Sequence, residues 1–138
     1  MNTNWPAHLP ATSVRFARPT TRLDACTAFY RDALGIPVLA EFRGHAGYDG
    51  VVLGLPDRSV QLELIERTEG GPLPDPSAEH QLVLYLGDHE AVTQAADRLR
   101  ERGVESVAAE NPYWTERGAV AFMDPDGWVV TLAPWEYE

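Results

Sequence analysis

The sequence has little positive charge, one cysteine and no long hydrophobic run. Its 138 residues include 11 Lys plus Arg against 21 Asp plus Glu, so the formal net charge is −10. Such an excess of negative charge repels nucleic acid phosphates and anionic membrane surfaces. We therefore expect no nucleic-acid partner and no membrane partner. We interpret the acidity as a source of solubility rather than as a site for a cationic ligand.

The single cysteine, Cys26, excludes an internal disulfide and fits a reducing compartment. No apolar run reaches the roughly 20 residues of a membrane helix, and residues 1–12 lack the basic start and apolar stretch of a signal peptide. These absences predict a cytoplasmic protein. Helical spacing places Cys26 on a core-facing side, so we favour packing over nucleophilic chemistry for this thiol.

The first half of the chain predicts a strand, a helix and three more strands. Apolar residues alternate around Val14 and Phe16, which is typical of a strand over residues 13–18. Thr21 and Asp24 resemble a capping box for a helix over residues 22–34, and Gly35 is suited to end it. The three following strands are expected at residues 37–42, 50–55 and 59–66.

The second half repeats this order after a linker over residues 67–78, which is rich in Gly and Pro. A strand is expected at residues 81–86, and Asp88 is suited to cap the helix that follows and ends at Gly103. Further strands are expected near residues 104–108, 118–123 and 128–133. The last two are joined by Asp-Pro-Asp-Gly at 124–127, a strong turn signal.

The two halves indicate an internal duplication. Gly35 and Gly103 are 68 positions apart, and the third strands are expected to begin at Gly50 and Gly118 with the same spacing. A gapless alignment with this offset makes Val52 identical to Val120 and Leu64 identical to Leu132. The repeated element order supports the duplication more than these identities do.

The residues 29–35, Phe-Tyr-Arg-Asp-Ala-Leu-Gly, and the turn at 124–127 resemble the vicinal-oxygen-chelate superfamily. This superfamily includes glyoxalase I, extradiol dioxygenases, and fosfomycin and bleomycin resistance proteins. The stretches 15–20, 44–50 and 111–114 resemble most closely an uncharacterised bacterial subgroup of it. The resemblance implies an α+β fold, in which two tandem βαβββ modules form a cupped mixed sheet with helices outside. We expect one domain over 1–138, with module 1 at about 13–66 and module 2 at about 79–135.

The superfamily's metalloenzymes bind their ion through side chains of the first and last strand of each module, commonly His and Glu. The resemblance places these positions at Arg15, Glu63, Gln81 and Thr131. Only Glu63 is a plausible ligand for a transition metal, and Arg15 adds a permanent positive charge. We therefore expect no metal and no cofactor.

Strand alternation, independently of the family resemblance, places polar side chains on the cup-facing side. If Val14 and Phe16 face the helices, Arg15 faces the cup. The same counting places Gln61, Glu63, Gln81, Val83, Tyr85, Val129 and Thr131 on cup-facing positions. Arg15 and Glu63 could address a ligand, or they could form an ion pair that only braces the cup. For Gln81 or Thr131 alone, a satisfied structural role is the commoner case.

Loop residues extend the candidate ligand site. His45 lies in a Gly-flanked turn beside Tyr48 and could reach the mouth of the cup, although a histidine in a surface loop is more often without such a role. Trp114, with Tyr113, could form an aromatic lid or could cover the edge of the core. The candidate ligand-binding residues are Arg15, Gln61, Glu63, Gln81, Tyr85, Thr131, His45, Tyr48 and Trp114.

Our leading hypothesis is a metal-independent binding protein of the glyoxalase and bleomycin-resistance type, which sequesters a small organic drug or metabolite. The alternative is a lyase, isomerase or dioxygenase of the same superfamily, with a metal or with Glu63 as the catalytic base. A third possibility is a cup filled by its own side chains, which would leave a scaffold. Exposed sheet edges and apolar rims, together with the resemblance, predict a homodimer with two equivalent sites.

Overall fold

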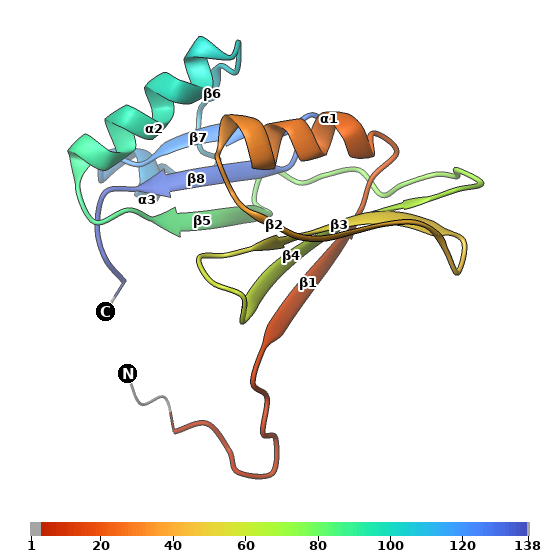
Figure 1. The fold of residues 1–138 in the computed structure, drawn as a ribbon. Coiled ribbons are helices and arrows are strands. Elements are labelled where there is room, and N and C mark those ends of the chain that lie inside the picture. The colour runs from red at the N-terminus through yellow and green to blue at the C-terminus, as the bar shows by residue number, and fades with distance from the viewer. Residues whose placement is uncertain (1–3, 138) are drawn as a thin grey trace.

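The computed structural model describes residues 4–137 as two four-stranded mixed sheets, each with a helix that links its first two strands. Sheet A has the strand order β1-β4-β3-β2 and sheet B the order β5-β8-β7-β6 (Figure 1). Both modules therefore have the expected βαβββ order. Residues 1–3 and 138, at the ends of the expected domain, lie outside the described residues. The strands are β1 (Val14–Pro19), β2 (Val38–His45), β3 (Tyr48–Gly54), β4 (Val60–Arg67), β5 (Gln81–Tyr85), β6 (Ser106–Val107), β7 (Val120–Met123) and β8 (Val129–Ala133).

The first helix differs from the expectation at its start and in its winding. It comprises α1 (Leu23–Thr27) and a π-helical segment, η1 (Ala28–Ala33). The expected capping box of Thr21 and Asp24 is wrong, because no side chain caps this helix from its N-cap residue, Arg22. The Thr20 hydroxyl accepts from the Arg22 N–H at 2.9 Å instead, and the Glu66 carboxylate accepts from the Leu23 N–H at 3.0 Å. Glu66 is distant in sequence, so local spacing could not predict this cap.

The second helix, α2 (His89–Glu101), forms as expected. The Asp88 carboxylate accepts from the Ala91 N–H at 2.8 Å, which satisfies one of the amides that a helix start leaves unpaired. A short helix that was expected to be a loop, α3 (Pro112–Glu116), begins at Asn111, whose side chain accepts from the Tyr113 N–H at 3.0 Å. The Asn-Pro pair is an N-cap followed by an N1 proline.

One hydrophobic core joins the helix-facing sides of both sheets. Helix α1 packs on β3 and β4, and α2 packs on β8. The core includes the fully buried Leu64, Leu99 and Phe122, together with Cys26, as its spacing predicted. The concave sides of the two sheets, which carry the alternate residues of each strand, consequently point away from this shared core.

The duplication needs one correction. Core residues of β4 and β8 keep the offset of 68, since Leu64 and Leu132 are equivalent. In the third strands, however, Val51 pairs with Leu64 whereas Val120 pairs with Leu132, so the offset there is 69. The gapless alignment of Val52 with Val120 is therefore out of register, and it matches a concave-face residue with a core-facing one.

Strand β1 is unusually exposed for a strand with a parallel partner. Within residues 4–137 it pairs with β4 alone, and Val14 and Phe16 are 58% and 64% exposed. The segment before it, residues 4–12, runs away from both sheets (Figure 1). Among residues 4–137, no helix has the length and hydropathy that crossing a bilayer requires.

Candidate functional site

A buried ionic network connects the two modules. Arg18, at the end of β1, is 4% exposed and donates to Asp124 at 2.6 Å and to Asp126 at 3.0 Å, in the turn between β7 and β8. The Tyr30 hydroxyl of η1 donates to the same Asp124 oxygen at 2.7 Å. The other Asp124 oxygen accepts from the Asp126 and Trp128 N–H groups. Every charge in the network is therefore paired and hydrogen-bonded.

Burial and this charge arrangement set the pKa values of the network. Burial alone would lower the pKa of Arg18, but Asp124 and Tyr30 raise it above its ordinary value, so Arg18 stays charged. Burial raises the pKa of Tyr30, and the Asp124 charge raises it further. Burial also raises the pKa of Cys26 to about 11, so this thiol is neutral at physiological pH. A neutral, buried thiol is a poor nucleophile, in agreement with the packing interpretation.

The predicted polar group of sheet A is assembled on its concave side. The Arg15 Nε donates to Gln61 at 2.8 Å, and its Nη1 lies 3.5 Å from a Glu63 oxygen. The Arg15 side chain is 47% exposed, and that of Glu63 is 14% exposed. Arg15 and Glu63 thus share the concave side, as strand alternation predicted, and they form an ion pair whose arginine is exposed to water.

The predicted residues of sheet B form separate groups. The Thr131 hydroxyl donates to the Gln81 side chain, and Thr131 is completely buried. Tyr85 lies in a ring cluster with Trp114, Trp135 and Tyr137, in which the two tryptophan rings stack at 5.7 Å. Within residues 4–137, no hydrogen bond, ion pair or ring contact joins these groups to Arg15 or Glu63. One chain therefore does not gather all the predicted residues in one cup.

His45 and Tyr48 face each other across the β2–β3 hairpin. His45 packs beside Phe42, with ring centroids 6.1 Å apart, and is exposed. Tyr48 lies opposite Arg67 of β4 and lines a small pocket at the end of the concave side of sheet A. The hairpin thus places Tyr48, rather than His45, in a cavity wall.

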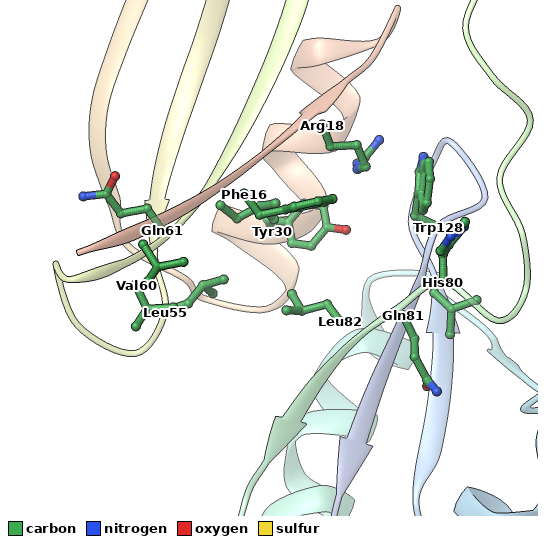
Figure 2. A pocket seen from close by; sticks show the side chains of 13 residues that line it. Phe16, Arg18, Tyr30, Leu55, Val60, Gln61, His80, Gln81, Leu82 and Trp128 are labelled. Carbon is green, nitrogen blue, oxygen red and sulfur yellow. The ribbon is translucent and has the colours of Figure 1, made fainter. Parts of the chain in front are cut away.

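A larger cavity of about 350 Å³, which we call the inter-module cavity, lies between the modules beside the Arg18 network. A neighbouring cavity of about 540 Å³ also has walls from both modules. The walls of the inter-module cavity come from the core-facing side of β1, from η1, from the β3–β4 turn and the start of β4, and from residues at or just before the starts of β5 and β8 (Figure 2). Phe16 and Leu82 form part of its apolar lining, whereas Arg18 and the Tyr30 hydroxyl supply polar groups at one end. The complete lining is Val14, Phe16, Arg18, Tyr30, Leu55, Val60, Gln61, Leu62, His80, Gln81, Leu82, Trp128 and Val129.

Trp128 gives this cavity an aromatic wall. Its ring lies 5.4 Å from that of His80, and the Arg18 guanidinium lies 5.5 Å from its centroid. Of the predicted ligand residues, Gln61 and Gln81 line the cavity, but Arg15 and Glu63 do not. Sequence reasoning missed Arg18, His80 and Trp128. An arginine at a core-facing strand position was the signal for Arg18, whereas the contact of His80 with Trp128 depends on the path of the linker.

Comparison with known proteins identifies both halves of the chain. A family model described as the YycE-like N-terminal domain matches residues 14–65, and one described as the YycE-like C-terminal domain matches residues 79–133. The YycE protein of Bacillus subtilis (strain 168) is 38% identical over 122 residues, which cover 88% of this chain and 87% of that protein.

Solved structures agree with these matches. A YycE protein of unknown function from Bacillus subtilis is 34% identical, covers 96% of both chains and superposes with a TM-score of 0.90. TnmS3, an antibiotic binding protein from Streptomyces sp. CB03234, is 26% identical, covers 88% of this chain and 94% of its own, and gives a TM-score of 0.64. The chain therefore belongs to the YycE-like family, within the vicinal-oxygen-chelate superfamily of glyoxalase and of bleomycin and fosfomycin resistance proteins.

Proposed function

We propose that this protein binds a small organic molecule without a metal ion, and that it acts by sequestering a drug or metabolite. The observation that carries the proposal is the inter-module cavity of about 350 Å³, which is apolar over most of its wall and has a few polar side chains. Small-molecule sites have this character, because apolar walls bury the ligand and a few polar groups orient it. The likeness to TnmS3, an antibiotic binding protein, supports the same class of function.

The side chains at the superfamily's metal positions support binding without a metal ion. Arg15, Glu63, Gln81 and Thr131 offer one carboxylate among them, and Arg15 already lies beside it. Within residues 4–137, no three His, Cys, Asp or Glu side chains are grouped so that they could hold an ion. Elemental analysis of the purified protein tests this part. One tightly bound divalent metal per chain, lost in Glu63→Ala, would instead support the metalloenzyme.

We also propose a homodimer in which a second copy covers β1. In the described part of the chain, strands β1 and β5 each pair with one neighbour, so each presents a free edge. Val14 and Phe16 add exposed apolar surface along β1 and line the open cavity. A second copy at this edge would bury that surface and close two equivalent cavities.

Sedimentation tests this assembly. We expect a dimer at tens of micromolar, an order of concentration typical for association tests, and a monomer for Val14→Asp, because burying its carboxylate at an interface is unfavourable. Val14 is 58% exposed, so this change should not disturb the fold of the chain. A wild-type species of 15.3 kDa under these conditions would contradict the proposal.

Ligand binding is tested by a thermal-shift screen of metabolites and antibiotics, because a ligand that binds only the native state raises its melting temperature. The variant Leu82→Trp places a larger ring in the cavity wall, whereas Leu9→Trp makes the same change at an exposed site in the N-terminal segment. We expect a ligand's stabilising effect to disappear in Leu82→Trp and to persist in Leu9→Trp. An undiminished effect in a folded Leu82→Trp would show that the ligand binds elsewhere.

A further inference from the structure

We propose that a second pocket, at the end of the concave side of sheet A, binds an oxyanion. The anion is either a free small ion or the carboxylate, phosphate or phosphonate group of a larger molecule. The pocket has a volume of about 190 Å³ and shares no lining residue with the inter-module cavity, so the inference does not depend on the proposed function. It is lined by Pro19, Thr20, Thr21, Tyr48, Ile65, Arg67, Gly70, Gly71 and Leu73.

Arg67, the last residue of β4, supplies the positive charge. Its Nη2 donates to the Pro72 carbonyl at 3.0 Å. Within residues 4–137, no carboxylate oxygen lies within 4.0 Å of its guanidinium, whereas six other arginines have such an ion pair: Arg15, Arg18, Arg22, Arg31, Arg43 and Arg100. In a chain with a net charge of −10, a pocket arginine without a neighbouring carboxylate is available to an incoming anion.

The backbone of the linker packs against this guanidinium. Gly70 and Gly71 follow β4 with φ angles of 72° and 130°, which residues with a side chain rarely adopt. A Cβ atom at position 71 would lie 3.3 Å from the Arg67 Cζ and Nη1 atoms. The glycine pair thus lets the chain turn tightly against the guanidinium, and the Pro72 carbonyl holds one of its nitrogens. A donor held in place in this way loses little freedom when an anion binds.

The rest of the pocket suits an anion of a few atoms. Thr21 and Tyr48, whose side chains carry hydroxyl groups, are part of the wall, and the lining contains no Asp or Glu. The volume suits a small oxyanion rather than the body of a drug-sized ligand, whose pockets are several hundred Å³. A larger molecule would extend along the concave side past Ile65, which shares that side of β4 with Arg67 and Glu63.

Isothermal titration with inorganic phosphate and with phenylphosphonate tests the site. We expect phosphate to bind the wild-type protein with a Kd on the order of 1 mM. Arg67→Met should weaken binding by about tenfold or more, because it removes charge-assisted hydrogen bonds. Arg67→Lys, which keeps the charge but loses the planar fork, should weaken it less. The matched control is Arg58→Met, because Arg58 is an exposed arginine of the β3–β4 turn outside this pocket.

The two probes distinguish the sources of the anion. Equal affinity for both would indicate a free small anion, and tighter binding of phenylphosphonate would indicate an anionic group on a larger body. Absence of binding by both probes, or equal binding by wild type and a folded Arg67→Met protein, would overturn the proposal. If Arg67→Met does not fold, as judged by circular dichroism, unchanged binding by Arg67→Lys and by Gly71→Ala would overturn it instead.

Discussion

The ion pairs of Arg15 and Arg18, which both lie on β1, differ in exposure, in distance and in which module supplies the carboxylate. On the concave side of sheet A, Arg15 is 47% exposed and lies 3.5 Å from Glu63 of the adjacent strand. On the core-facing side, Arg18 is 4% exposed and lies 2.6 Å from Asp124 of the other module. The buried pair cannot be rescued by water if one member is removed, whereas the exposed pair can. The difference indicates that Arg18 holds the modules together and that Arg15 is free to serve another purpose.

Removing the buried pair should have the largest effect on the free energy of unfolding. Arg18→Met should destabilise the protein by about 3–5 kcal/mol, because Asp124 would be left as a buried charge without its partner. Urea unfolding monitored by circular dichroism measures this free energy. Arg22→Met, which removes an exposed arginine next to the same turn, is the control and should change stability by less than about 1 kcal/mol. Similar losses in the two variants would refute the distinction between the regions.

Alkaline pH should lower the stability of the protein by a smaller amount, through the Cys26 thiol beside the same network. The folded-state pKa of Cys26 is raised to about 11 from 9.0, so the unfolded chain loses this proton first and stability falls as the pH rises between these values. The expected loss is up to about 2 kcal/mol. Urea unfolding at pH 8 and pH 10.5 should show a steeper decline for wild type than for Cys26→Ala. Since Tyr30 also has a raised pKa, only the difference between the two proteins reports on the thiol.

The concave side of sheet B supplies a third test, because Thr131 on that side is completely buried whereas Arg15 on the concave side of sheet A is exposed. Thr131→Val removes the hydroxyl that donates to Gln81 at a completely buried position, which should cost about 1 kcal/mol. The response to any ligand found in the screen should be unchanged, since Thr131 does not line the inter-module cavity. A ligand response that disappears while stability stays constant would assign Thr131 to the site, as the sequence-based prediction had it.

The smallest loss of stability is expected for substitutions in the exposed pair, Arg15 and Glu63. Arg15→Ala and Glu63→Gln should each cost about 1 kcal/mol or less, because water can solvate the remaining partner. Thermal melting with and without ligand measures both stability and binding. Destabilisation as large as that of Arg18→Met would make the pair a structural brace. Loss of the ligand response in folded protein would place the ligand on the concave side, as predicted from sequence, rather than in the cavity.

Local patterns predicted most of the architecture. The period of two along β1 and β4 placed Arg15, Gln61 and Glu63 together, and Asp88 capped its helix as expected. Features that depend on distant parts of the chain were not accessible. The Glu66 cap, the π-helical winding of η1 and the Arg18 network all depend on tertiary packing. The one-residue shift between Val52 and Val120 shows that a few identities cannot fix the register between duplicated modules.

The Arg18–Asp124 pair also bears on how the chain folds during its synthesis. The two residues are 106 positions apart, so a ribosome has made most of the protein before the partner of Arg18 emerges. Until then module 1 contains an arginine whose charge must stay hydrated, and its core next to β1 cannot close without cost. We therefore expect the packing of module 1 next to β1 to be completed only once the β7–β8 turn is present. Contacts between residues so far apart in sequence slow folding. A fragment that ends at the linker should therefore fold less stably than module 1 does in the whole protein.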